Sequence, residues 1–373
     1  MNYSLNPETE ALVDQLRELI QPGEKLFMVG GMVRDILLNL EVHDIDLSLI
    51  GDVRKFGKKA ADKLNGAFYM LNDKYNAARI ILSGNSKPQR WIDIVGTYQS
   101  DIYRDLEHRD FTINSMAIDF QNRGKLIDPL NGSSDLRLKV LRLSNSNGIK
   151  DDPIRIMRAI RLAVKFDLKM DPETIQTIKQ DSGLLKGVVS ERLRDELFRF
   201  IELSKLDTAL QLANHFNLRF FDCGWNLAFG ENRLKEFSLE SIQRIQLLQI
   251  FDTLILRESK PDGALNLLQA ELAINFREYR NALQTYFSTC IVPNRSFWQM
   301  MIFSVLIEDC QKNYLYPDEP AHSKKKESKI EKILNRFALS NQEKKWVRNF
   351  LSGISELTNL FNEYQAPEPG MVY

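Results

Sequence analysis

The chain has 373 residues, and its 50 Lys and Arg residues balance its 50 Asp and Glu residues. Charged residues make up 27% and hydrophobic residues 43%, which is ordinary for a globular protein and allows two or three domains. With a net charge of zero, a nucleic-acid partner would have to be held by local basic patches rather than by a globally positive field.

The sequence predicts neither a signal peptide nor a membrane-spanning segment. The stretch Met1–Ile20 carries several acids and no apolar core, so it does not resemble a signal peptide, and no run of about 18 apolar residues predicts a membrane span. Cys223, Cys290 and Cys310 are widely spaced and form neither a metal-ligand pattern nor a disulfide framework. We therefore expect a cytoplasmic protein without a membrane association.

Residues 1 to about 130 alternate helix and strand signals, which indicates an α/β or α+β arrangement. Helices are predicted at 7–20, 32–40 and 53–64, and strands at 25–29, from 44, 67–71, 77–82 and 91–95. From 149 to about 360 the periodicity is helical and strand signals are sparse. The sequence Asp151-Asp152-Pro153 predicts a helix start, because Asp caps helices and Pro fits the first turn.

Two short patterns early in the chain point to a nucleotide. Gly30 and Gly31 separate a predicted strand from a helix, where backbone N–H groups can converge on an anion without a Cβ in the way. Asp44 and Asp46 are two apart on a predicted strand, so both carboxylates face the same side, about 6.6 Å apart. Either pattern alone is more often a plain turn or a solvated strand end. Together they predict a nucleoside triphosphate bound with magnesium.

Two further carboxylates and an arginine are candidates on neighbouring segments. Asp93 lies on a predicted strand and is a candidate third metal ligand; the alternative is an exposed strand residue. Arg109 and Asp110 are adjacent, with Asn114 four residues later. Arg can bind phosphate and Asp can accept hydrogen bonds from ribose hydroxyls. A surface ion pair at a helix start is an equal alternative for Arg109 and Asp110.

The predicted helix after Pro153 carries three arginines on one flank. Steps of three residues place Arg155, Arg158 and Arg161 over roughly 120° of the helix surface. Like charges at this spacing repel unless an anion is near. The flank is therefore either a solvated face, or paired with Glu191 or Glu196, or part of a site for an anion.

Two regions of the C-terminal half are of interest. A group of four aromatic residues within 220–229 is predicted to be core rather than a base-stacking platform; its members are Phe220, Phe221, Trp225 and Phe229. The basic region 323–348 is either a solvated face or a patch that binds a phosphate backbone. The tail 365–373 is expected to be disordered.

Four motifs agree in order and spacing. They are Gly30-Gly31-x-Val-Arg34-Asp35 with Asp44-x-Asp46, Arg109-Asp110-Phe111-Thr112-Ile113-Asn114, Asp128-x-x-x-Gly132, and Asp151-Asp152-x-x-Arg155-x-x-Arg158-x-x-Arg161. This combination, over about 25–200, resembles the class II tRNA nucleotidyltransferases (CCA-adding enzymes) and bacterial poly(A) polymerases. The resemblance implies an α+β fold. A DNA polymerase β-like nucleotidyltransferase head (1–148) would be followed by an all-helical neck (149–205) and a helical, tRNA-binding body and tail (206–373).

The resemblance also implies roles. Asp44 and Asp46 would be catalytic and bind two Mg²⁺ ions, with Asp93 as a possible further ligand. Asp128 and Gly132 would lie in a hinge-like element. The nucleotide-binding residues would be Gly30, Gly31, Arg34, Arg109, Asp110, Asn114, Asp152, Arg155, Arg158 and Arg161.

Within that set, Asp152 and Arg155 would select the base. A carboxylate accepts from the exocyclic amine of cytosine or adenine, and a guanidinium donates to the ring nitrogen beside it. Guanine and uracil present the opposite polarity and would leave buried groups unpaired. The pair therefore favours CTP and ATP over GTP and UTP.

Departures from the family pattern bear on the product. His108 stands where the family usually has arginine, Asp151 where it has glutamate, and Asn39 where it has glycine. Only 13 residues separate Val95 from Arg109, whereas members that add the terminal A usually carry a longer flexible loop there. The short connection resembles CC-adding enzymes.

We therefore expect a template-independent RNA nucleotidyltransferase that adds C and A, or only C, to tRNA 3′ ends from CTP and ATP, with no protein partner. A poly(A) polymerase would differ in product length and in its use of CTP. A silent RNA-binding protein on the same fold is disfavoured by the intact Asp44 and Asp46. A phosphohydrolase is disfavoured because it needs several histidine ligands, and the chain has only His43, His108, His215 and His322.

Overall fold

The computed structural model describes residues 5, 7–42, 44–73, 76–82, 90–122, 125–218, 237–253, 274, 276–293, 295–313 and 329–363. The chain divides into two compact units. Unit 1 comprises Met1–Arg155 and Phe166–Thr177, and unit 2 comprises Ile156–Lys165 and Ile178–Tyr373. Several predictions fall outside the described residues: those on His43, His322, the aromatic group 220–229, the basic residues 323–328 and the tail 365–373.

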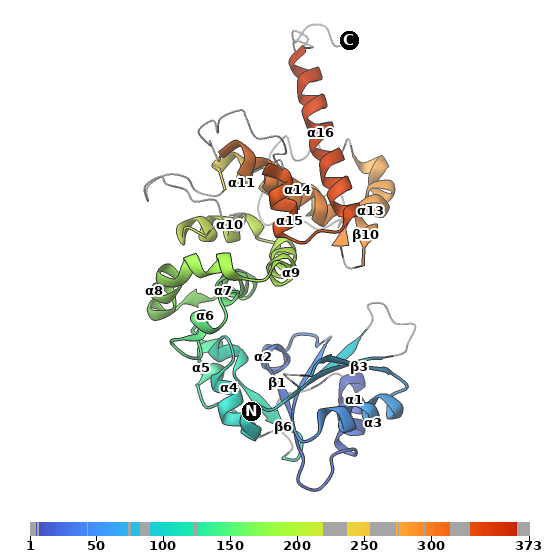
Figure 1. The fold of residues 1–373 in the computed structure, drawn as a ribbon, viewed down its shortest axis with the longest axis vertical. Helices are drawn as coiled ribbons and strands as arrows, with labels where there is room; N and C mark the ends of the chain where they lie inside the picture. Colours follow the sequence, from blue (N-terminus) through green and yellow to red (C-terminus); the bar gives the residue numbers. More distant parts are fainter. Residues whose placement is uncertain are drawn as a thin grey trace, which may run out of the picture. The chain divides into compact units, whose positions relative to one another are not determined.

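Unit 1 is built on a seven-stranded sheet of order β3-β4-β5-β2-β1-β6-β7 (Figure 1). Its strands are β1 Lys25–Val29, β2 Ile45–Ile50, β3 Ala67–Asn72, β4 Ala77–Ile81, β5 Trp91–Gly96, β6 Ala117–Asp119 and β7 Leu126–Ile127. Its helices are α1 Pro7–Arg17, α2 Gly31–Leu37, α3 Val53–Lys63, α4 Ile102–Glu107, α5 Gly132–Arg137 and α6 Gly148–Asp151, with 3₁₀ turns η1 Tyr98–Ser100 and η2 Thr112–Asn114. The mixed arrangement predicted for this half of the chain is confirmed.

The sheet separates an apolar face from the face that carries the carboxylates. On β2, the side chains of Ile45, Leu47 and Leu49 are buried. Asp46 alternates with them and therefore points to the opposite face. Strand β5 runs parallel to β2, whereas the other pairings within the sheet are antiparallel.

Helix α2 ends at Leu37, three residues before the predicted end, because the chain turns there. Asn39 adopts a left-handed backbone conformation with φ of 54°. The Asn39 N–H donates to the Ile36 carbonyl, and the Leu40 N–H donates to the Asp35 carbonyl. This is a Schellman motif, whose left-handed position favours glycine and, after it, asparagine. The motif explains why asparagine can stand here in place of the family's glycine.

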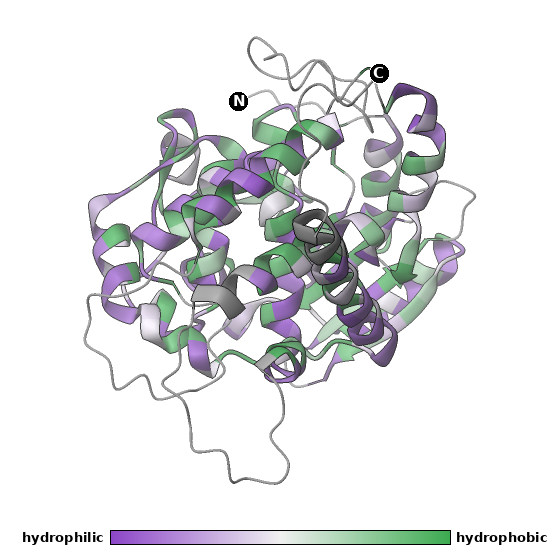
Figure 2. Cartoon of the chain, turned by 90° about the horizontal axis from the view of Figure 1, so that it is seen from above, coloured by the Kyte–Doolittle hydropathy of each residue, from purple (hydrophilic) through white to green (hydrophobic). Residues whose placement is uncertain are grey.

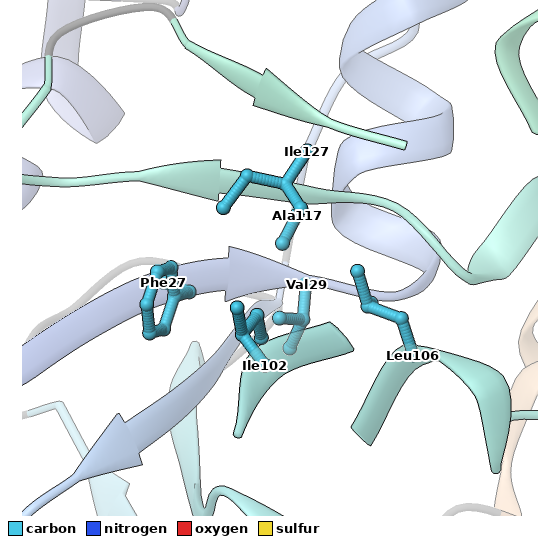
Figure 3. Close-up of a cluster of buried hydrophobic side chains, with 6 residues drawn as sticks. All are labelled: Phe27, Val29, Ile102, Leu106, Ala117 and Ile127. Atoms are coloured by element: carbon cyan, nitrogen blue, oxygen red, sulfur yellow. The ribbon is translucent and has the colours of Figure 1, made fainter. Parts of the chain in front are cut away.

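Helix α4 packs on the carboxylate-bearing face of the sheet, over β1 (Figure 3). Figure 3 shows Ile102 and Leu106 of α4 against Phe27 and Val29 of β1; Ala117 and Ile127 complete this buried cluster. Leu106 and Ala117 are fully buried. Burying a side chain of the size of Leu106 contributes on the order of 2 kcal/mol. The end of α4 is therefore held close to Gly30, the residue that follows β1.

The helix predicted to start at Asp151-Asp152-Pro153 begins later. Helix α7 spans Arg155–Phe166, and Asp151 is instead the last residue of α6. Asp152 is extended, with φ of −150° and ψ of 92°, because a residue that precedes proline is disfavoured in the helical region. The Arg155 N–H donates to the Asp152 carbonyl, which closes the turn into α7.

The chain returns to unit 1 at Phe166, the last residue of α7. Strand β9 (Lys169–Met170) pairs in parallel with β8 (Val140–Leu141). Thr174, on α8 (Pro172–Asp181), accepts a hydrogen bond from the Leu143 N–H. The Arg142 guanidinium pairs with Asp171 at 2.8 Å. These contacts fix the segment after Phe166 on the first unit.

Unit 2 is mostly helical, as predicted. Its elements, with α7 and the end of α8, are η3 Ser182–Gly187, α9 Ser190–Ile201, α10 Leu206–His215, α11 Leu239–Phe251, η5 Arg277–Tyr279, α13 Arg280–Ser288, β10 Cys290–Val292, β11 Arg295–Ser296, α14 Phe297–Asn313, α15 Lys329–Arg336 and α16 Asn341–Glu363. The β10–β11 ladder was not expected from the sequence. In Figure 2, hydrophobic and hydrophilic residues alternate along the helices. Of the described helices, none has the length and apolar character that crossing a membrane requires.

The start of α16 is fixed by a capping box and by a buried ion pair. The Glu343 N–H donates to Ser340 Oγ, and the Ser340 N–H donates to Glu343 Oε2 at 2.7 Å. Glu343 is 1% exposed, and its other oxygen accepts from Arg295. The Arg295 guanidinium lies 5.3 Å from the centre of the Phe198 ring. Three elements, α9, β11 and α16, thus share one charged cluster.

Candidate active site

Asp46 is the centre of a group of charges on the sheet. Its partner across the parallel β2–β5 pair is Asp93, so the two carboxylates point to the same face. Burial raises the pKa of Asp46 from 3.8 to about 6, with Asp93 and Asp44 adding to the rise and Arg109 and Arg34 opposing it. The structure thus brings three predicted carboxylates and two predicted arginines into electrostatic range of one another. Asp44 lies just before β2 rather than within it.

Gly30 lies between an arginine and a carboxylate of this group. Its φ of 71° and ψ of −141° belong to a region that L-residues with a side chain avoid. A Cβ built at Gly30 would lie 3.0 Å from Arg109 Nη1 and 3.8 Å from Asp46 Oδ2. The glycine therefore serves two purposes: it permits this backbone turn and it leaves room for the two charged side chains to approach.

Arg109 follows the end of α4. Its guanidinium donates to Asp105 Oδ2 through Nε at 3.2 Å and Nη2 at 3.0 Å. The alternative of a surface ion pair at a helix start is not what the structure shows, because Arg109 lies past the end of α4 and pairs with Asp105, one turn earlier. Asp105 holds one edge of the guanidinium, while Nη1 faces Gly30.

A buried chain of hydrogen bonds links three of the predicted nucleotide-binding residues. Arg34 Nη1 donates to Asn114 Oδ1 at 2.7 Å, and Asn114 Nδ2 donates to Asp110 Oδ1 at 3.0 Å. The Phe111 N–H also donates to Asp110 Oδ1. Arg34, Asp110 and Asn114 are between 5% and 7% exposed. Asp110 therefore acts here as an internal acceptor that orients Asn114 and, through it, Arg34.

Asp93 is paired with Arg79 of β4. The guanidinium donates through Nε and Nη2 to the two carboxylate oxygens, each at 2.7 Å. These hydrogen bonds raise the pKa of Arg79. A bidentate pair of this kind is directional and strong. A metal ion could recruit Asp93 only by competing with Arg79.

The residues present fit Mg²⁺. Among the described residues, no three His, Cys, Asp or Glu side chains form a metal cage on their own. Mg²⁺ does not require one, because it is usually held by one or two carboxylates together with substrate phosphates and waters. The like charges that raise the pKa of Asp46 also make a cation favourable at Asp44 and Asp46.

The predicted base-selecting pair lies in unit 1. Arg155 Nη2 donates to the His108 carbonyl at 2.7 Å, and a Cβ built at Gly148 would lie 2.9 Å from Arg155 Nη1. Gly148 therefore makes room for this side chain. Asp152 and Arg155 are both partly exposed, and their backbones are joined by the turn into α7.

Arg158 and Arg161 belong to unit 2. Arg161 Nε donates to Glu196 Oε1, and Arg199 lies 3.7 Å from the same carboxylate. The alternative that Glu196 is a partner of this flank is confirmed for Arg161. A nucleotide-binding role for Arg158 and Arg161 stays a prediction.

Three residues near the site were missed from the sequence. Asp105 had a detectable signal, since an acid four residues before an arginine is at a spacing that favours an ion pair. Arg79 could be assigned to Asp93 only once the strand register was known. Phe166, whose ring centre lies 4.3 Å from Arg34 Cζ, had no signal beyond being an aromatic residue.

Two stretches of the chain match known sequence families. Residues 26–142 match the poly A polymerase head domain, and residues 167–219 match a family described as the probable RNA and SrmB-binding site of polymerase A. A CC-adding tRNA nucleotidyltransferase from Geobacter sulfurreducens is 35% identical over 181 residues. The chain thus contains a region of the poly A polymerase head-domain type at residues 26–142. The resemblance seen in the motifs is thereby confirmed.

Curated members of this family match only over part of their length. The Geobacter match covers 48% of this chain and 41% of that protein. A CCA-adding enzyme from Lactobacillus johnsonii is 31% identical over 198 residues, which are 51% of this chain and 49% of that enzyme. The chain thus aligns with about half the length of these relatives.

Solved structures match over almost the whole chain at lower identity. A tRNA-processing enzyme in an apo form has a TM-score of 0.67 at 20% identity and covers 99% of this chain and 84% of its own. A tRNA nucleotidyltransferase complexed with a primer tRNA and an incoming ATP analogue has a TM-score of 0.62 at 21% identity and covers 96% and 87%. At this identity the likeness concerns the fold, and it confirms the predicted α+β head followed by a mostly helical remainder.

Proposed function

We propose that this protein is a template-independent nucleotidyltransferase that adds C, or C and A, to tRNA 3′ ends from CTP and ATP. The observation that carries the proposal is the arrangement around Gly30, where Arg109 Nη1 and Asp46 Oδ2 approach one backbone position. A cation for phosphate and a carboxylate for metal are adjacent there. Triphosphate binding and nucleotidyl transfer need both.

In this proposal Arg34 and Arg109 bind the triphosphate. Each guanidinium is held by neighbours, Arg34 by Asn114 and Arg109 by Asp105. A guanidinium that is already oriented loses little conformational freedom when phosphate binds. Gly30 and Gly31 let the backbone approach the same phosphates.

Asp44 and Asp46 would hold Mg²⁺ together with the triphosphate. Bound Mg²⁺ would supply charge stabilisation at the α-phosphate and favour attack by the RNA 3′-hydroxyl with departure of pyrophosphate. The two arginines would stabilise the negative charge on the phosphates as pyrophosphate leaves. Asp93, held by Arg79, is kept in this proposal as a further ligand.

Asp152 and Arg155 would select the base by the hydrogen-bond polarity described above. The contact of Arg155 Nη2 with the His108 carbonyl supports this role, because it anchors one edge of the guanidinium and limits its orientations. Arg158 and Arg161 would complete the nucleotide site.

Addition of CC without the terminal A is the finer form of the proposal. Two observations support it. The connection between β5 and Arg109 is occupied by η1 and α4, which leaves no long loop, and a relative of 35% identity is named a CC-adding enzyme. The three-part division 1–148, 149–205 and 206–373, tRNA binding by the last part and a cytoplasmic location belong to the same proposal.

The test uses purified protein, Mg²⁺ and three tRNA transcripts that lack the CCA end, stop after the first C, or stop after the second C. We expect labelled CTP to be incorporated into the first two and labelled ATP into none. ATP incorporation into the third would show CCA addition instead. No incorporation of either nucleotide would overturn the proposal, and Asp44→Ala provides the inactive control.

Poly(A) addition is the second candidate, favoured by the description of the matched head-domain family. It predicts long products from ATP alone on an RNA of any 3′ sequence. Product length on a gel separates it from the first candidate in the same assay.

A further inference from the structure

The guanidinium of Arg34 is enclosed on several sides. Its Nε donates to Asp35 Oδ1 at 2.8 Å and its Nη1 donates to Asn114 Oδ1 at 2.7 Å. A Cβ built at Gly31 would lie 3.2 Å from Nη2. Arg34 Cζ lies over the aromatic ring of Phe166, 4.3 Å from the ring centre.

The Phe166 ring differs from the other neighbours in what it contributes. A ring over a guanidinium attracts the cation through its electron-rich face and accepts no conventional hydrogen bond. It therefore limits the tilt of the guanidinium without occupying N–H groups that a phosphate could use. Asp35 and Asn114 hold N–H groups of Arg34 by hydrogen bonds, and the ring holds the central carbon of the guanidinium over its face.

Phe166 is itself held in place. It is the last residue of α7 and belongs to unit 1. Three residues later β9 pairs with β8, and Asp171 then pairs with Arg142. The ring that contacts Arg34 thus belongs to a segment that is fixed to the rest of unit 1 by β9 and by Asp171.

The same helix begins with the proposed base-selecting arginine. Arg155 is the first residue of α7 and donates to the His108 carbonyl. The two ends of α7 thus contact two parts of the proposed nucleotide site: Arg155 the base-selecting part, and Phe166 the arginine proposed for the triphosphate.

We propose that Phe166 is a positioning residue for Arg34, and that it sets the affinity for the triphosphate part of the nucleotide. The inference rests on the proposed function only in taking Arg34 as a triphosphate ligand. It assigns no contact between Phe166 and substrate.

The test compares Phe166→Leu, which keeps an apolar side chain without a ring, with Phe166→Tyr, which keeps the ring. Dissociation constants are measured for a non-reactive methylene analogue of CTP and for CMP. We expect Phe166→Leu to weaken the CTP analogue about tenfold and to leave CMP unchanged, with Phe166→Tyr close to wild type. A merely structural role would lower the amount of folded protein and leave both constants as they are.

A matched control is Phe198→Leu in unit 2, which removes a ring that also covers an arginine, Arg295, at 5.3 Å. It should cost stability without changing the affinity for the CTP analogue. In an Arg34→Gln background, Phe166→Leu should have no further effect on that affinity, since the ring acts through the arginine.

The outcomes separate the two proposals. Wild-type incorporation with equal analogue affinity in wild type and Phe166→Leu would overturn the inference and leave the proposed function standing. Analogue binding that depends on Phe166, without incorporation into any tRNA, would overturn the proposed reaction and support the inference. A wild type that neither binds the analogue nor incorporates nucleotide would overturn both.

Discussion

Gly30 is the residue at which backbone conformation and side-chain placement depend on each other most directly. Its positive φ makes any L-side chain strained there, at a cost of about 1–3 kcal/mol. A Cβ added at Gly30 would also lie too close to Arg109 Nη1. The position of that atom matters to the proposed triphosphate site.

We predict that Gly30→Ala lowers nucleotide incorporation roughly 100-fold, because small displacements of binding groups have effects of that size. The control is Gly23→Ala. Gly23 also has a positive φ, 87°, but a Cβ added there would meet no atom within 4 Å. Gly23→Ala should lose stability to a similar degree and retain activity, as measured by thermal unfolding and incorporation. Equal activity of the two variants would contradict the assignment.

Asp46 and Asp93 are cross-strand neighbours whose carboxylate charges are stabilised to different degrees by their surroundings. Asp46 is destabilised as a charged group by burial and by Asp93 and Asp44, whereas Asp93 is compensated by Arg79 through two hydrogen bonds. Removing the charge should therefore have opposite effects on stability at the two positions.

We predict that Asp46→Asn abolishes incorporation yet raises the free energy of unfolding without Mg²⁺ by on the order of 1 kcal/mol. Asp93→Asn should lower it by about 1–3 kcal/mol, because Arg79 loses its charged partner. Urea denaturation in EDTA at pH 8 measures both. A loss of stability in Asp46→Asn as large as in Asp93→Asn would contradict this account of the charges.

At the scale of elements, α5 shows how one glycine sets a contact between two segments. A Cβ built at Gly132 would lie 2.0 Å from the Thr112 carbonyl oxygen, so α5 and η2 approach more closely than any larger residue permits. The Gly132 N–H donates to Asp128 Oδ1 at 2.7 Å and the Ser133 N–H donates to Asp128 Oδ2 at 3.0 Å. Asp128 thus caps the N-terminus of α5. Gly132 allows α5 to pack closely against η2. The hinge-like role expected for this pair stays a prediction.

We predict that Gly132→Ala lowers the free energy of unfolding by about 2–4 kcal/mol, since the obstacle is backbone and cannot rotate away. Gly183→Ala is the matched control. Gly183 lies in η3, and no atom is within 4 Å of the added group. Its free energy of unfolding, measured by urea denaturation, should stay within about 0.5 kcal/mol of wild type. A small effect of Gly132→Ala would mean that α5 can move away from η2.

The sequence predicts elements well where periodicity governs them and poorly where contacts do. Strand β1 is predicted with its observed ends, because apolar residues and the following glycines mark it clearly. The predicted start of α7 is too early, because Asp151 and Pro153 satisfy a capping pattern while Pro153 also excludes its predecessor from the helix. The motif residues of the site are detectable as separate signals. The pairings of Asp93 with Arg79 and of Arg34 with Phe166 depend on register and on the return of the chain to unit 1, which no local pattern encodes.

At the scale of the whole molecule, the ion pairs of unit 2 differ in how deeply they are buried. Arg295 and Glu343 join β11 to α16, and Glu343 is almost fully buried. Arg348 and Glu331 also form a bidentate pair, but Arg348 is 47% exposed. In the described part of the basic region, Arg336 also donates to the carbonyls of Leu185 and Val188. Arg336 and Arg348 therefore both make contacts within unit 2. Binding of a phosphate backbone by this region stays a prediction.

We predict that Arg295→Met destabilises the protein by about 3–5 kcal/mol, because Glu343 would remain buried without its partner. Arg348→Gln should cost less than about 1 kcal/mol, as exposed pairs do. Differential scanning calorimetry would show a lower transition temperature for the first variant only. Similar losses in both would mean that burial does not decide the strength of these pairs.

The path of the chain between the two units limits how the protein can be divided. The backbone leaves unit 1 after Arg155, returns at Phe166 and leaves again after Thr177. A fragment cut at residue 148 or 155 would carry β8 without β9, and it would lack both Asp171, the partner of Arg142, and the ring over Arg34. Its exposed strand edge would favour self-association. An excised fragment that keeps unit 1 intact would therefore have to extend to at least Thr177. It would include α7, most of which belongs to unit 2, without the rest of that unit.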